Sequence, residues 1–274
     1  MKRTLVVLAL LLLAGCGQKE DHAWLGYAEG DNAFVAAPQA GWIGRMTVNR
    51  GDWVHRGQLL FTLDSQAQTA TRDQAVAAIA NARGQLVEAQ ATLALNEKEL
   101  ARQAGLMRAN AGTKQNYDIA KANRETAAAR VRQIEAEIAQ NEATLSGAAY
   151  QLSQRDVVSL TDGRVQDVYF RTGEYAAAMT PVVSVLPPEN VYVRFFVPEN
   201  EFSRVRLGQR VAISCDGCAK GMTARVAFIA QQEEFTPPVV FSVDSRQKLV
   251  FKIEARVPGG LKLNPGQPVD VRPL

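Results

Sequence analysis

Cysteine and histidine are the residues of this 274-residue chain that could support nucleophilic, redox or metal chemistry, and the chain has three cysteines and two histidines. Cys215 and Cys218 lie together in ISCDGCAKG, whereas His22 and His55 lie far from them in the sequence. A zinc site needs about four ligands, and a thioredoxin-like motif needs its first cysteine at the start of a helix. The Asp-Gly between the cysteines is instead typical of a turn between strands. In an exported protein the pair predicts a structural disulfide or two unreactive thiols, and redox or metal chemistry is the less favoured interpretation.

The N-terminal segment predicts export and lipid attachment. A basic start precedes the apolar run 5–13, which is too short to span a bilayer. The sequence LAGC, which ends at Cys16, resembles the lipobox of bacterial lipoproteins, in which the cysteine is acylated and becomes the first residue. The resemblance implies a signal peptide over residues 1–15 and a periplasmic chain lipid-anchored to the inner membrane, although Gly17 leaves the outer membrane open. The alternative is an ordinary secretory signal with an incidental cysteine.

Charge and composition argue against a nucleic-acid partner. The chain has 31 basic and 28 acidic residues, for a net charge of +3, and no concentrated basic face is evident. Its 47% hydrophobic and 22% charged residues are typical of a folded protein. No recognisable pattern of catalytic, cofactor-binding, metal-binding or cargo-binding residues emerges. We therefore expect a protein that is not an enzyme and that carries no cofactor or metal.

Residues 65–154 predict two long helices. Proline is absent, and alanine, glutamate, glutamine, lysine and arginine predominate. Apolar residues recur every seven positions at Ile79, Leu86, Leu93, Leu100 and Met107, and again at Val131, Ile138, Leu145 and Leu152. This narrow seam is typical of a coiled coil. A break between Gly105 and Gly112, with Thr113 as a candidate N-cap, predicts an antiparallel hairpin with arms of about 60 Å. The hairpin is either a dimerisation stalk or a device that reaches a partner.

The segments on either side of these helices form an internal repeat. The matched positions include Gly41 and Gly163, Gly51 and Gly173, and Ile43 and Val165, each pair 122 residues apart. One copy contains too few short strands to bury a core alone. The two segments, 33–64 and 155–186, therefore predict two halves of one β domain.

The first of these halves resembles the first half of a biotinyl/lipoyl carrier domain, on the pattern APxxG…VxxGDxVxxGQxLxxL. Carriers hold a modified lysine where this chain reads DSQA from residue 64, so no attached cofactor is expected. A lipoyl-like domain split by a helical hairpin resembles the HlyD-type membrane fusion proteins, the periplasmic adaptors of efflux pumps and exporters. The resemblance implies an elongated α+β fold that ends in a small β-barrel over 187–274, with its first strand in 16–32.

The hairpin turn carries a second resemblance. Adaptors that engage a TolC-like outer-membrane channel share an arginine, then after three residues a leucine, and after six more a serine. This chain has Arg102, Leu106 and Thr113 at these spacings, with threonine in place of serine. The resemblance implies that Leu106 packs into an apolar notch of the channel and that Arg102 and Thr113 hydrogen-bond to it. Alternatively Leu106 packs the loop, Thr113 caps a helix and Arg102 is solvated, and both roles can hold at once.

The C-terminal segment bears on the inner-membrane partner. The chain ends at Leu274, which would leave no room for the membrane-proximal domain of many RND-pump adaptors, and residues 234–257 resemble adaptors of ABC-type exporters. The expected partners are therefore an inner-membrane transporter, ABC rather than RND, a TolC-like channel, and further copies in a ring, often of six. The alternatives are an RND-pump adaptor and a structural coiled-coil lipoprotein without a transport role.

Overall fold

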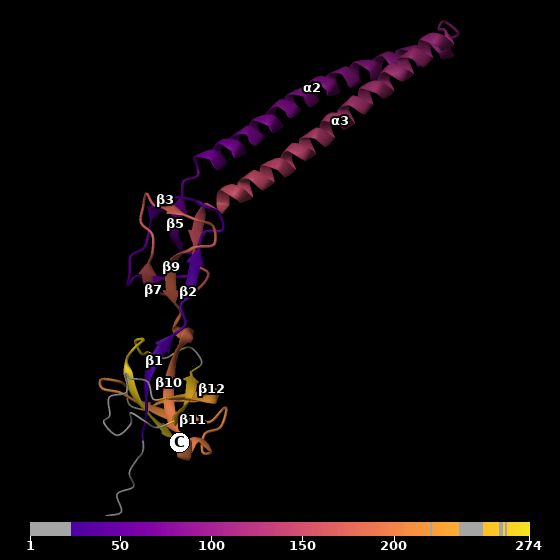
Figure 1. The fold of residues 1–274 in the computed structure, drawn as a ribbon. Coiled ribbons are helices and arrows are strands. Elements are labelled where there is room, and N and C mark those ends of the chain that lie inside the picture. The colour runs from indigo at the N-terminus through magenta and orange to yellow at the C-terminus, as the bar shows by residue number, and fades with distance from the viewer. Residues whose placement is uncertain (1–22, 220, 236–248, 258–259, 261) are drawn as a thin grey trace, which may run out of the picture. The chain divides into compact units, whose positions relative to one another are not determined.

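The structure is a computed structural model that describes residues 23–219, 221–235, 249–257, 260 and 262–274 (Figure 1). The expected signal peptide 1–15 and the expected lipidation site Cys16 lie outside the described residues. The chain divides into two units. One contains 34–160 and 167–183, and the other contains the described part of 1–33 together with 161–166 and 184–274.

Two antiparallel helices form the predicted hairpin in the first unit. Helix α2 spans Gln66–Arg108 and helix α3 spans Lys114–Ser153, and they lie side by side in Figure 1. Ion pairs cross between them, from Arg83 to Glu142 at 3.0 Å and from Arg124 to Glu97 at 3.1 Å. Because these pairs are exposed, each adds little to stability. Packing of the apolar seam must therefore hold the hairpin together.

The seam is narrow and rich in alanine, as the seven-residue repeat predicts. Its buried members are Ala75, Ile79, Ala82 and Ala89 of α2 and Ala120, Ala127, Ala128, Val131, Ile134 and Ala148 of α3. Near the middle, Leu86, Leu93 and Ile138 pack against a cluster of Ala89, Val131 and Ile134. The small alanine side chains allow the two backbones to approach closely. In the part of the chain that the structure describes, no helix is long and apolar enough to cross a membrane.

The β domain consists of two four-stranded sheets that follow the internal repeat. The first half supplies β2 (Ala33–Ala36), β3 (Gly41–Met46), β4 (Trp53–Val54) and β5 (Leu59–Leu63), and the second supplies β6 (Asp156–Val158), β7 (Gly163–Val168), β8 (Tyr175–Ala176) and β9 (Pro181–Leu186). Strands β7, β8 and β9 each begin 122 residues after β3, β4 and β5.

The halves of this domain exchange strands. The sheet orders are β6-β5-β3-β8 and β2-β9-β7-β4, so each sheet contains strands of both halves. In the first sheet Gly41 of β3 pairs with Ala176 of β8. The buried side chains fall at repeat-equivalent positions, namely Ile43 and Val165, Val54 and Ala176, Leu60 and Val182, and Phe61 and Val183. Because each sheet contains strands of both halves, we expect that neither half folds alone.

The second unit contains a closed six-stranded barrel. Its strands are β1 (Trp24–Gly30), β10 (Val191–Pro198), β11 (Arg210–Ser214), β12 (Met222–Phe235), β13 (Leu249–Arg256) and β14 (Pro268–Pro273), in the order β1-β10-β13-β12-β11-β14. A short helix, α4 (Glu199–Phe202), follows β10, and a 3-10 turn, η1 (Pro188–Asn190), precedes it. Closure removes the unpaired edges that an open sheet would expose.

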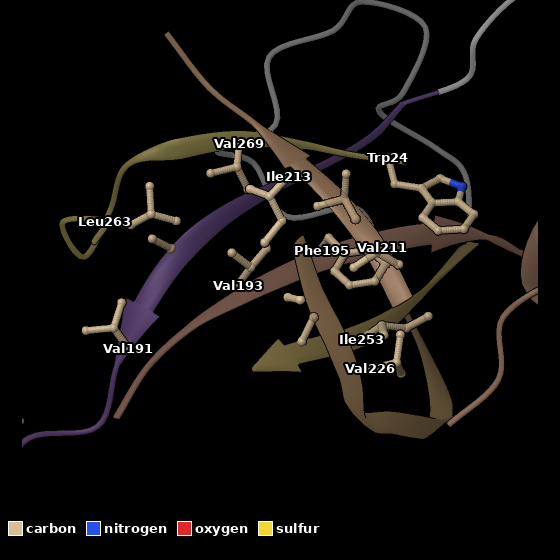
Figure 2. Close-up of a cluster of buried hydrophobic side chains, with 14 of the residues drawn as sticks. Trp24, Val191, Val193, Phe195, Val211, Ile213, Val226, Ile253, Leu263 and Val269 are labelled. Atoms are coloured by element: carbon tan, nitrogen blue, oxygen red, sulfur yellow. The ribbon is translucent and has the colours of Figure 1, made fainter. Parts of the chain in front are cut away.

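The barrel interior is filled by branched aliphatic side chains around one aromatic pair (Figure 2). The rings of Trp24 and Phe195 stack with centroids 5.6 Å apart. Val193, Val211 and Ile253 are buried in the same cluster. The predicted α+β fold, with a split lipoyl-like domain, a helical hairpin and a small barrel, is confirmed.

Candidate functional site

The turn between the two helices forms the hairpin tip, which we define as residues 99–113. Helix α2 ends at Arg108, and the chain then closes on the last carbonyls of that helix. The amide of Ala109 donates to the carbonyl oxygen of Gly105 at 3.1 Å, and that of Ala111 donates to Leu106 at 2.9 Å. Asn110 lies between them in the left-handed region, with φ at 57°, a conformation that asparagine tolerates better than most residues. Hydrogen bonds to the last carbonyl groups of α2 therefore fix the path of the loop.

Gly112 brings the loop back against α2. A Cβ atom on this residue would lie 3.0 Å from the Cβ of Leu106 and 3.1 Å from the amide nitrogen of Met107. Both distances are shorter than an ordinary van der Waals contact. The absence of a side chain at residue 112 therefore allows the loop to lie close against Leu106 and Met107.

Leu106 and Met107 present adjacent apolar side chains at the tip. Each is 36% exposed. Met107 continues the seven-residue repeat in the sequence, but its side chain is exposed and does not belong to the buried part of the seam. Exposed apolar side chains that cluster on a rigid element are typical of a contact surface.

Thr113 is the N-cap of α3, as predicted. Its backbone is extended, and its Oγ1 accepts a hydrogen bond from the amide of Asn116 at 3.2 Å. The bond uses the hydroxyl oxygen as an acceptor, so the hydroxyl hydrogen can still donate to a second group. Capping and partner binding are therefore compatible at this residue.

Arg102 forms a local network that sequence reasoning missed. Its Nε donates to Oε2 of Glu99 at 2.9 Å and its Nη2 donates to Oε1 at 2.8 Å. The side-chain amide of Gln103 donates to the same carboxylate at 2.8 Å. The bond from Gln103, followed by that from Arg102, lowers the pKa of Glu99. The Glu-x-x-Arg spacing in the sequence could have indicated this pair.

The network leaves Arg102 able to bind a partner. Its side chain is 66% exposed, and these two bonds engage two of its five N–H donors. Arg102 and Leu106 are four residues apart on α2 and therefore share a helix face. All three residues predicted from the turn motif lie at the hairpin tip, where they combine an apolar side chain with hydrogen-bond donors.

The cysteine pair lies in the second unit. Cys215 and Cys218 form a disulfide across the turn between β11 and β12, with Cα atoms 5.3 Å apart. The side-chain amide of Gln267 lies 3.2 Å from Sγ of Cys215. No group of three or more His, Cys, Asp or Glu side chains with metal-binding geometry occurs within the described ranges. His55 lies in the turn before β5, and His22 is outside the described residues.

Comparison with known proteins begins with the hairpin. Residues 78–155 match a family model described as the RND MFP alpha-helical hairpin domain, where MFP denotes membrane fusion protein. Over 114 residues the chain is 33% identical to a UPF0194 membrane protein of Acidithiobacillus ferridurans, which covers 41% of this chain and 34% of that protein. Over 273 residues it is 28% identical to a UPF0194 membrane protein of Yersinia pseudotuberculosis, covering 85% and 83%. The chain spans less than half the length of two curated relatives, 34% of one and 44% of another.

The fold agrees with the hairpin match. The crystal structure of MacA from Actinobacillus actinomycetemcomitans is similar, with a TM-score of 0.68 at 21% identity, over 92% of this chain and 78% of that one. The hairpin of this chain thus matches the hairpin domain of membrane fusion proteins, and its fold is that of MacA. Membrane fusion proteins are adaptors without enzymatic activity, which agrees with the expectation that this chain is not an enzyme. The matched range includes the hairpin tip, with Arg102, Leu106 and Thr113.

Proposed function

We propose that this chain is a lipid-anchored periplasmic adaptor that links an inner-membrane exporter to a TolC-like outer-membrane channel. The observation that carries the proposal is the hairpin tip, where the apolar side chains of Leu106 and Met107 are exposed in the last turn of α2. An apolar side chain flanked by the donors of Arg102 and Thr113 fits the helical end of a channel, which offers apolar notches and carbonyl acceptors. The tip would dock there while the rest of the chain stays with the transporter.

The length of the hairpin supports a reaching role. Helix α2 has 43 residues, which corresponds to about 65 Å at 1.5 Å per residue. The seam of this pair is closed by its own alanines and branched residues, so the two helices need no further chain to pack. A rod of this length serves a purpose other than building a domain core, and contact with a distant partner is such a purpose.

Docking is tested by Leu106→Asp, with Leu95→Asp as the matched control. Leu95 lies on the same helix and is 68% exposed, so its replacement should be equally harmless to folding. We expect Leu106→Asp to abolish both efflux and crosslinking to the channel in cells, with helicity and Tm unchanged. We expect Leu95→Asp to retain both. Crosslinking that persists in the Leu106→Asp variant would show that the tip is not the docking site.

For the inner-membrane partner we infer an ABC-type exporter. Support comes from the resemblance of residues 234–257 to ABC-exporter adaptors, whereas the matching hairpin model carries RND in its description. Copurification of the detergent-solubilised complex, with the partner identified by mass spectrometry, distinguishes the two. Recovery of an ABC ATPase is expected, and recovery of an RND transporter would overturn the inference.

Cys16 would carry the lipid that holds the adaptor at the inner membrane. Six copies of the chain would form a ring around the export duct. Cys16→Ser in the full chain should move the protein from the membrane fraction to the periplasmic fraction. Native mass spectrometry of the purified chain should show a closed oligomer, and a chain that is monomeric at every concentration would contradict the ring.

A further inference from the structure

The outer face of the barrel has a groove beside the disulfide turn. Its volume is about 790 Å³, and sites for small molecules typically have volumes of about 300–1,000 Å³. Strand β14 lies between β1 and β11 in the barrel. It forms the floor of the groove, whereas β1 forms one wall and the turn after β11 forms the other. The groove is therefore large enough for a ligand of several rings.

The wall formed by β1 is apolar, because alternate side chains of this strand point out of the barrel. Trp24 and Ala28 are buried in the barrel core, whereas Leu25 is 41% exposed. Successive side chains of a strand point to opposite faces, so Leu25 and Tyr27 point outward, where both line the groove. Pro268 of β14 adds a further apolar surface. An apolar ligand can pack against these side chains, and an aromatic ring such as that of Tyr27 also attracts cations.

The groove carries negative charge. Of the lining residues that the structure describes, only Asp216 and Asp270 are charged. Within the described ranges neither carboxylate accepts a hydrogen bond or forms an ion pair, so both are available to a ligand. Arg194 on the neighbouring strand β10 does not compensate them, because it is paired with Glu29 at 2.6 Å and with Glu254 at 3.0 Å. A positively charged ligand would therefore be attracted to the groove.

The disulfide turn holds Asp216 in its place in the wall. The disulfide between Cys215 and Cys218 closes this turn, and the amide of Cys218 donates to the carbonyl oxygen of Cys215 at 3.2 Å. Gly217 follows Asp216 with φ at 79°, a left-handed conformation that glycine adopts without steric cost. The side-chain amide of Gln267, which precedes β14, contacts Sγ of Cys215. The wall is thus formed before a ligand arrives, and less conformational freedom is lost on binding.

We propose that this groove binds an amphipathic organic cation. Its apolar rings would pack against Leu25 and Tyr27, and its positive charge would lie near Asp216 and Asp270. The apolar wall favours a ligand with rings, and the two carboxylates favour a cation over an anion. The site lies within the second unit and does not depend on docking of the hairpin tip. Binding can therefore be measured on the purified chain without a transporter or a channel.

Isothermal titration calorimetry of the full chain in detergent tests the proposal. Tetraphenylphosphonium is the cation, and tetraphenylborate is the matched anion, with the same four phenyl groups and the opposite charge. We expect tetraphenylphosphonium to bind at one site per chain, more weakly as the salt concentration rises, and tetraphenylborate not to bind. Equal binding of the two ions would overturn the proposal, and so would the absence of tetraphenylphosphonium binding at millimolar concentration.

Surface variants assign the binding to the groove. We expect the double variant Asp216→Asn with Asp270→Asn to weaken tetraphenylphosphonium binding by about tenfold. Leu25→Ser should weaken it by about fivefold, because an apolar contact is lost, and Tm should stay unchanged in both. Phe228→Ser is the control, because Phe228 is also an exposed apolar residue of the barrel, at 47%, but does not line the groove. Because the detergent contributes equally to all four chains, native affinity in the double variant would show that the cation binds elsewhere.

Discussion

Arg155 donates a hydrogen bond from Nη1 to the carbonyl oxygen of Ala40 at 3.0 Å, and so joins the end of α3 to the start of β3. The carbonyl oxygen of Arg155 in turn accepts from the amide of Leu63 at 2.8 Å. Gly41 makes room for the guanidinium, because a Cβ there would lie 2.6 Å from Nη1. The base of the hairpin is thus attached to the β domain by a buried arginine, which was not predicted from the sequence.

Loss of this arginine should destabilise the first unit. Arg155→Met would leave the carbonyl of Ala40 without its donor, at a cost of about 1–3 kcal/mol. Arg155→Lys keeps one donor and should cost less. The free energy of unfolding in urea is the measurement, and equal stabilities of the methionine variant and the native chain would show that water replaces the bond without cost.

Substitution of Gly112 should disturb the tip, whereas substitution of Gly105 should not. Gly112→Val places atoms against Leu106 and Met107 and should destabilise the hairpin by about 1–3 kcal/mol, because the loop must move away. A Cβ at Gly105 meets nothing within 4 Å, so Gly105→Ala should stabilise α2 by up to about 1 kcal/mol. Thermal unfolding followed by helical circular dichroism measures both. A Gly112→Val variant with native stability would refute the close contact.

Substitutions of Thr113 should distinguish its role as a helix cap from a role in docking. Thr113→Val keeps the shape but removes the acceptor for the Asn116 amide, and it should cost about 1 kcal/mol of hairpin stability. Thr113→Ser retains both the acceptor and the donor and should behave as the native residue in unfolding and in channel crosslinking. If the valine variant unfolds earlier but still crosslinks fully, the hydroxyl is a cap and takes no part in docking.

Ionisation of Tyr192 at alkaline pH should lower the stability of the barrel. Burial raises the pKa of its hydroxyl, and so does the hydrogen bond that it donates to Glu29 at 3.0 Å. The pKa of Tyr192 in the folded state lies above its value of about 10 in the unfolded state. The stability that the protonated hydroxyl contributes is therefore fully present below about pH 10. This stability is lost as the pH rises further, because the unfolded state releases the proton first. Tyr192→Phe should show a smaller fall in Tm above pH 10 than the native chain, and equal falls would contradict this assignment.

The tip was predicted in part. The spacing of Arg102, Leu106 and Thr113 placed all three residues at the turn, and the cap at Thr113 followed from its position before a helical pattern. The bonds of Glu99 to Arg102 and Gln103 were missed, although all three residues lie within one turn of α2 and their spacing could have indicated the pair. The exposure of Met107 could not be read from the sequence, because it depends on how the two helices pack.

Local patterns in the sequence determined the long helices, their seven-residue seam and the 122-residue repeat, because these reflect backbone propensity and side-chain periodicity along one chain. Only the tertiary structure decided the exchange of β4 and β8 between the halves, the buried Arg155 at the base of the hairpin, and the left-handed conformation of Met179. Each of these depends on atoms brought together from distant parts of the chain, and neither propensity nor periodicity encodes such distances.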